Sequence, residues 1–292
     1  LINFTQGIIR KVSKNDRQLK FGGFILWFIT VGITYLTTYA IVKLFSFNIL
    51  LSIVVNSFII YTTLATKCLK DEALKIYNVL KTEDIEKSRI QLSYIVGRDT
   101  TNLSEPEIIR ATVETVAENT VDGIIAPMFY AFIGGAPLAM AYKAINTLDS
   151  TVGYKNKKYK DIGFASAKID DIANYIPARI SVILMTIGSF FLNYNYRNCF
   201  KISIRDRKNH KSPNCAFSEG AVSGALGIQL GGTNVYFGEK VYKPTIGDKL
   251  REIDKEDIIK TNKIMYASSF VSMLVFTLIY VLCRMILINL II

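Results

Sequence analysis

The fold is decided by residues 110–179, which read RATVETVAENTVDGIIAPMFYAFIGGAPLAMAYKAINTLDSTVGYKNKKYKDIGFASAKIDDIANYIPAR. Glu, Asp, Asn, Lys and Arg side chains surround an apolar run that is interrupted by Pro127, the pair Gly134–Gly135 and Pro137. Polar groups in such apolar surroundings cost much free energy unless they are paired or bind something. They are therefore candidates for a functional site.

The composition indicates a membrane protein. Half of the 292 residues are hydrophobic and only 20% are charged. Apolar runs of about 20 residues, the length that crosses a bilayer, recur at Phe21–Val42, Leu44–Thr66, Gly123–Tyr142 and Ile264–Cys283, with a shorter one at Ile180–Tyr196. We predict an all-α, polytopic integral membrane helical bundle with four to five membrane segments, forming a single membrane-embedded domain over residues 1–292.

The net charge of +11 is carried by the loops, which first suggests cytoplasmic loops facing anionic lipid and only second an anionic substrate. Leu1–Lys20 is basic and amphipathic without the apolar core of a signal peptide, so the N-terminal side is expected to be cytoplasmic. No basic stripe with stacking aromatics indicates nucleic acid as a partner. The four scattered cysteines predict neither a disulfide framework nor a zinc site.

Between the spans, amphipathic patterns predict helices at Lys67–Asn78, Glu83–Tyr94 and Glu107–Asn119, and Ser104 with Glu107 forms a possible capping box. On the third helix four charged residues recur every four positions and share a face: Arg110, Glu114, Glu118 and Asp122. This face is either a solvated surface with an Arg110–Glu114 ion pair or part of a site.

Proline and paired glycines in Gly123–Tyr142 predict a broken or re-entrant segment that lines a cavity, although a kinked ordinary span remains an alternative. Asp170 and Asp171, with Asn174 one turn further on, could bind hydrated Mg²⁺ or cap a helix. The only histidine, His210, is either a surface residue or, among its cationic neighbours, a neutral imidazole with a lowered pKa. Arg197–Lys263 is predicted as a loop that ends in a charged helix at Asp248–Lys260, and its glycines match no nucleotide-binding spacing.

A resemblance sharpens this interpretation. Residues 113–180, with IVGRDT at 95–100, RDRKNHKSPN at 205–214 and GALGIQLGGTN at 224–234, resemble the CbiB/CobD family, the adenosylcobinamide-phosphate synthases. The similarity covers essentially the whole chain and is densest in residues 95–179 and 205–234. Two departures are a missing His-Pro segment before Leu1 and Ser218 where the family usually has proline.

The resemblance implies a ligase that joins adenosylcobyric acid to (R)-1-amino-2-propanol or its O-phosphate, driven by ATP and Mg²⁺, with no tightly bound prosthetic group. For such chemistry, Glu118, Asp122, Asp149 and Asp170 or Asp171 are expected to hold the metal. Asn119 and Asn146 would orient water or substrate amides, and His210 would accept a proton. The expected substrate and phosphate ligands are Arg98, Lys143, Arg179, Arg205, Lys208 and Asn214.

Because ATP is cytoplasmic, the loops that carry these residues should face the cytoplasm from the cell membrane. We therefore expect Gly123–Tyr142 to dip in and return, or to lie buried without spanning, and Ile180–Tyr196 could do the same. A transporter is a rival interpretation, but the internal repeats that it predicts are not found. A structural scaffold for other corrinoid enzymes is a second rival, for which so many charged residues would be excessive.

Overall fold

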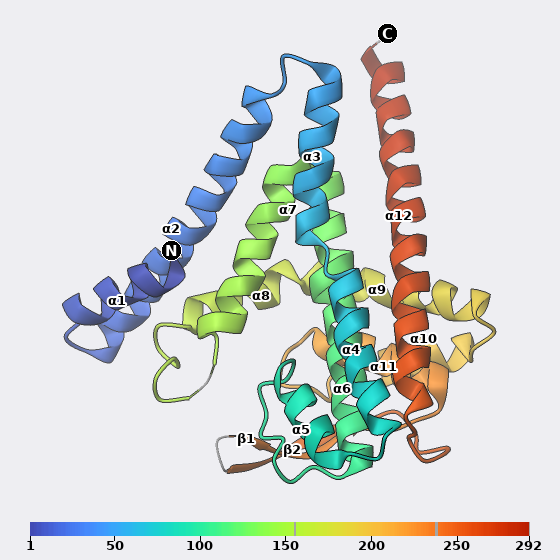
Figure 1. Ribbon diagram of the computed structural model, residues 1–292. Helices are drawn as coiled ribbons and strands as arrows, with labels where there is room; N and C mark the ends of the chain where they lie inside the picture. The colour runs from blue at the N-terminus through green and yellow to red at the C-terminus, as the bar shows by residue number, and fades with distance from the viewer. Residues whose placement is uncertain (155, 237–238, 292) are drawn as a thin grey trace. The chain divides into compact units, whose positions relative to one another are not determined.

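The chain is an all-α polytopic membrane protein, as predicted. A computed structural model describes residues 1–154, 156–236 and 239–291 (Figure 1). Within that part, four helices are long and apolar enough to cross a membrane, and one bent pair raises the number to five. They are Asp16–Leu44, Ile49–Leu80, Glu105–Val152 and Glu256–Leu287, with the pair Phe164–Ala173 and Tyr175–Phe191 bent by 43°. The predicted four to five membrane segments are confirmed.

The chain divides into two compact units, and each is built from two separate stretches. The first unit comprises Leu1–Leu64 and Ala126–Tyr175, and the second comprises Ala65–Ile125 and Ile176–Ile292. Each unit contains helices that are long and apolar enough to cross a membrane. The single membrane-embedded domain stays a prediction.

The first unit contains five helices: α1 (Ile2–Val12), α2 (Asp16–Leu44), α3 (Ile49–Thr63), α7 (Ala126–Val152) and α8 (Phe164–Ala173). Asparagine side chains begin two of them, because the Asn15 and Asn48 side chains accept hydrogen bonds from the amides of Gln18 and Leu51. Helix α2 packs on α7 and α8 around four fully buried residues, Leu26, Leu148, Val152 and Ile162.

Helix α7 folds back on itself at Gly134–Gly135, where the backbone leaves the helical region. The Tyr130 and Tyr142 rings stack with centroids 5.0 Å apart, whereas twelve residues of straight helix would separate them by about 18 Å. Gly135 has φ +65° and ψ −161°, a conformation that is essentially restricted to glycine. The predicted break is confirmed, and the segment reverses direction as a helical hairpin (Figure 1).

The second unit surrounds α6 (Glu105–Thr120), which is followed directly by a π-helical turn, η1 (Val121–Ile125). The other helices of this unit are α4 (Thr66–Leu80), α5 (Ile85–Ser93), α9 (Tyr175–Phe191), α10 (Tyr196–Arg205), α11 (Cys215–Leu226) and α12 (Glu256–Ile291). The Ser104–Glu107 capping box is present at the start of α6. Helix α6 packs against α4, α11 and α12 and is buried along most of its length.

Two local predictions for residues 227–260 need correction. A two-stranded antiparallel sheet, β1 (Leu230–Tyr236) and β2 (Glu239–Ile246), lies in the stretch that was predicted as loop. The predicted helix Asp248–Lys260 is wrong in its first half, because α12 begins at Glu256. Residues 248–255 are instead held by Arg251, which donates hydrogen bonds to the Leu226 and Glu252 carbonyls and binds Asp257.

Candidate functional site

A buried ion pair lies at the centre of the polar cluster in the second unit. Arg98 binds Glu114, and their side chains are only 6% and 4% exposed. Glu114 Oε1 also accepts a hydrogen bond from the Gly231 amide at 2.8 Å and lies 3.8 Å from Arg110. The predicted Arg110–Glu114 pair therefore exists, but Glu114 is buried and Arg110, Glu118 and Asp122 are half-buried, so the face is not a solvated surface.

Strand β1 supplies the remaining partner of this pair. The Asn234 side-chain oxygen accepts hydrogen bonds from Arg98 at 2.5 Å and from Arg110 at 3.3 Å. The two strands pair with Asn234 opposite Val241 and Gly232 opposite Lys243, which explains how a short hairpin places Asn234 against α6. Arg98 is thus held by an acidic and an amide group from two different elements.

Glu118, one helical turn beyond Glu114, faces α11. The Cys215 thiol donates a hydrogen bond to Glu118 Oε1 at 3.0 Å. Burial, and then the charges of Glu118 and Asp122, raise the pKa of Cys215 well above its usual value, so the thiol stays protonated. The Asn119 side chain donates to the Thr115 carbonyl of its own helix at 2.9 Å.

Glu219 brings a second buried carboxyl group to the same cluster. Its side chain lies in α11, where every residue from Ala216 to Leu226 is buried. Burial, followed by the charges of Glu114 and Glu118, raises the pKa of Glu219 well above its usual value. The cluster therefore contains a buried carboxyl group with a strongly perturbed pKa beside other acidic groups, an arrangement that is typical of functional sites.

His210 lies against Lys243, with 3.3 Å between Nε2 and Nζ. Burial and then the Lys243 charge lower the pKa of His210, which confirms the predicted direction, although burial is the larger cause. Nδ1 accepts a hydrogen bond from the Ser212 amide at 3.0 Å, so the neutral ring carries its hydrogen on Nε2. Because Ser212 occupies the free lone pair, the role of His210 as a base stays a prediction.

The predicted phosphate ligands of the second unit have different surroundings. The Arg179 guanidinium lies 4.8 Å from the centre of the Phe217 ring and donates to the Asn214 side chain at 3.4 Å. Arg205 binds Asp206 and Asp248, and this contact lowers the pKa of Asp206. Lys208 is exposed. Arg179 and Asn214 are thus brought together. Arg205 instead joins the end of α10 to Asp248, which follows β2.

The first unit contains a separate acidic cluster where the end of α7 meets α8. Asp170 is 8% exposed and accepts a hydrogen bond from Asn174 at 3.1 Å. Asn146 also hydrogen-bonds this carboxylate, and the charge of Asp149 acts on it. Asp170 Oδ1 is buried without a hydrogen-bond partner. Tyr142 fixes the side chain of Asn174 by donating to it at 2.7 Å.

Lys143 lies beside this cluster but lines a different surface. It borders a cavity of about 430 Å³ between α2 and α7, whose walls include the hydroxyl-bearing residues Thr30, Thr34, Thr147 and Thr151. Asn146 and Asp149 are not among the lining residues of that cavity. Lys143 therefore faces the cavity, whereas Asn146 and Asp149 belong to the acidic cluster.

The donor set of the acidic cluster fits a hydrated magnesium ion. Within the described residues, no group of three or more His, Cys, Asp or Glu side chains could hold a metal by itself. Mg²⁺ needs only one or two carboxylates, because waters and substrate phosphates complete its shell. Asp149 and Asp170, with one buried carboxylate oxygen unpartnered, meet that requirement. Glu118 and Asp122 belong to the other unit, so a shell that includes them stays a prediction, as does the part of Asp171.

Some residues of the two clusters were not predicted from the sequence. Glu219 is the one acidic residue in a run of small apolar residues, CAFSEGAVSGAL, and this isolation was an available signal. Tyr142, which binds Asn174, was predicted only as the last residue of the apolar run Gly123–Tyr142. Lys243 had no signal, because its position depends on the register of the hairpin.

Comparison with known proteins gives one consistent result. A family model described as CobD/Cbib protein matches residues 1–265. The chain is 56% identical over 267 residues to "Cobalamin biosynthesis protein CobD" of Clostridium perfringens, covering 91% of this chain and 84% of that protein. It is 49% identical over 283 residues to "Cobalamin biosynthesis protein CbiB" of Salmonella typhi, covering 94% and 87%. No solved structure matches the chain significantly.

Proposed function

Because this chain belongs to the CobD/CbiB family of cobalamin biosynthesis proteins, we propose that it is an ATP-dependent amide ligase. It joins (R)-1-amino-2-propanol, or its O-phosphate, to a carboxylate of adenosylcobyric acid and gives adenosylcobinamide or its phosphate. The observation that carries this proposal is the family match over residues 1–265. Those residues include every one of the side chains discussed above as candidate ligands.

The chemistry requires an activated carboxylate, because a carboxylate and an amine do not condense at neutral pH. ATP would supply the activation, with Mg²⁺ neutralising the phosphate charge. The protein must therefore orient two large substrates, balance several negative charges and remove a proton from the attacking ammonium. The two polar clusters offer carboxylates, cations and amides for these tasks.

We assign the metal to Asp149 and Asp170, with Asp171, Glu118 and Asp122 as further candidates. Arg179 and Asn214 would bind an anionic group together, since their side chains already meet at 3.4 Å. Lys143, Arg205 and Lys208 would supply further positive charge to phosphates, and Arg98 would act in the substrate site. Asn119 and Asn146 would orient water or substrate amides, and His210, kept neutral by its surroundings, would receive the proton.

The proposed location is the cell membrane, with the polar clusters facing the cytoplasm, where ATP is present. The basic N-terminal stretch supports this orientation through the positive-inside rule. The fold-back of α7 supports it as well, because a hairpin does not carry the chain across the bilayer. The partners are then the corrinoid, the aminopropanol substrate and membrane lipid.

The test is turnover by the full chain reconstituted in membranes with cobyric acid, ATP, Mg²⁺ and either amine. Product mass distinguishes the free amine from its phosphate. Released ADP indicates an acyl phosphate, whereas released AMP indicates an acyl adenylate. Folded protein that yields no cobinamide product with either amine would refute the proposal.

Asp149→Ala tests the metal assignment. We expect activity to fall by about 100-fold or more, while membrane insertion and the thermal unfolding midpoint stay close to those of the wild type. Asp71→Ala is the matched control, because Asp71 is a surface aspartate whose only ion-pair partner among the described residues is Lys70, at 3.8 Å. Full activity of the Asp149 variant would exclude Asp149 from the magnesium site.

A further inference from the structure

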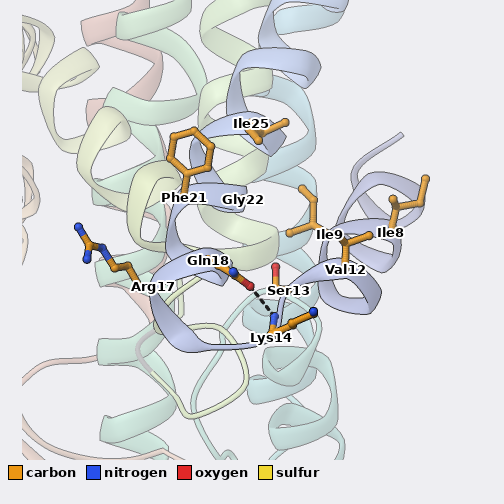
Figure 2. A pocket seen from close by; sticks show the side chains of 10 residues that line it. All are labelled: Ile8, Ile9, Val12, Ser13, Lys14, Arg17, Gln18, Phe21, Gly22 and Ile25. Carbon is orange, nitrogen blue, oxygen red and sulfur yellow. Dashed lines mark hydrogen bonds between the residues drawn. The ribbon is translucent and has the colours of Figure 1, made fainter.

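A groove of about 750 Å³ lies between α1 and the first two turns of α2. Figure 2 shows Ile8 and Val12 of α1 on one side and Arg17 and Phe21 of α2 on the other. Its volume is typical of pockets that hold a small molecule, which are about 300–1,000 Å³. The proposed ligase reaction makes no use of these residues.

The groove changes character along its length. Phe21 and Ile25 line the part that continues along α2 toward the membrane-spanning turns, and Lys14 lies at the opposite end (Figure 2). Lys14 and Arg17 make no ion pair within the described part of the chain. The ten residues that line the groove include no acidic side chain. The groove is thus apolar at one end and positively charged at the other.

Helix α1 places this groove at a membrane surface. Its apolar residues Phe4, Ile8 and Val12 recur at four-residue intervals and are 72%, 49% and 72% exposed. A helix with an exposed apolar stripe and basic residues beside it lies in the plane of the interface between lipid and water. Arg10 and Lys11 provide the basic residues in the last turn of α1.

The two helices are held close together, so the groove is formed before any ligand binds. A Cβ atom on Gly22 would lie 2.3 Å from Cγ2 of Ile9, so only glycine permits this approach. The Lys14 amide donates to the Gln18 side chain at 2.7 Å (Figure 2). The Asn15 side chain caps α2 by accepting a hydrogen bond from the Gln18 amide. The connection between the helices is therefore fixed by its own hydrogen bonds.

We propose that this groove binds one anionic phospholipid molecule. An acyl chain lies along Phe21, Gly22 and Ile25, the headgroup phosphate contacts Lys14, and Arg17 adds positive charge from the other side of the start of α2. Charge complementarity supports an anionic ligand, and the continuity of the apolar wall with a membrane-spanning helix supports a lipid rather than a soluble ion.

The test uses the purified full chain in neutral detergent micelles and native mass spectrometry. Phosphatidylglycerol and phosphatidylcholine with identical acyl chains are titrated separately, and the bound lipid per chain is counted. We expect phosphatidylglycerol to bind with one tight site, and phosphatidylcholine to bind at least tenfold more weakly. Basic residues strengthen binding to anionic lipid. The double variant Lys14→Gln with Arg17→Gln should therefore bind phosphatidylglycerol about 30-fold more weakly.

The matched control is Lys11→Gln with Lys43→Gln. This double variant also removes two positive charges, but from exposed residues of α1 and α2 that do not line the groove. We expect its affinity to remain within about threefold of wild type. Equal loss in both double variants, or equal binding of the two lipids, would overturn the proposal. So would displacement of the lipid by millimolar inorganic phosphate, because that result would indicate a site for a free anion.

Discussion

Removing the Glu114 carboxylate should destabilise the second unit strongly. Glu114→Ala deletes the ion pair with Arg98 and the hydrogen bond from the Gly231 amide. Arg98, whose side chain is 6% exposed, would keep its hydrogen bond to the Asn234 amide oxygen but lose its buried carboxylate partner. Leaving one charge of a buried pair without its partner costs about 3–5 kcal/mol. We therefore expect an unfolding midpoint lower by about 6–15 °C, at about 2–3 °C per kcal/mol.

The assay is thermal unfolding of the full chain in detergent, followed by circular dichroism. The matched control is Glu72→Ala, which breaks the more exposed Lys75–Glu72 pair and should cost under about 1 kcal/mol. A double variant, Arg98→Met with Glu114→Leu, removes both charges together and should recover much of the stability. The reasoning is refuted if the double variant is no more stable than Glu114→Ala, or if Glu114→Ala unfolds within about 2 °C of the wild type.

Two further variants test the hairpin tip and the histidine. Gly135→Ala should lower the free energy of unfolding by about 1–3 kcal/mol through its backbone conformation; a steric clash does not contribute, because the new Cβ would meet only Pro137 Cδ at 3.7 Å. Gly32→Ala in α2 is the control and should be neutral or stabilising, since its Cβ meets nothing within 4 Å. Equal effects of the two substitutions would contradict the argument. For His210, whose pKa is lowered on folding, the unfolded chain gains its proton first as pH falls, so native stability decreases below about pH 6.5. His210→Gln should make the unfolding midpoint less different between pH 7.5 and 5.5, and an unchanged difference would contradict the assignment.

The membrane helices were predictable because length and composition determine them. Phe21–Val42 lies within α2, and Ile264–Cys283 lies within α12. The break at Gly134–Gly135 was predictable as well, since glycine pairs and proline have few uses inside an apolar helix. What composition could not give was the direction of the chain after the break, because that depends on the backbone angles of Gly135.

The candidate site was predictable only in part. The four-residue spacing on α6 identified Glu114 and Glu118 as neighbours, but burial of that face depends on its contacts with α11 and β1. The hairpin was missed, because Gly231 and Gly232 weaken the alternating pattern of a strand. The contacts of Asn234 and Lys243 were therefore not predictable from the sequence. In the folded chain Asn234 accepts a hydrogen bond from Arg110 of α6, and Lys243 lies against His210.

The fold-back of α7 also determines how crossings of the bilayer are counted. A segment that returns along itself contributes zero or two crossings, and never one, so it leaves the parity of the chain unchanged. If the hairpin enters a bilayer, its two ends at Ala126 and Val152 therefore leave it on the same side, whatever the depth that Gly134–Gly135 reaches. A count based on hydropathy alone would take Glu105–Val152 as one crossing and would assign every later loop to the opposite compartment.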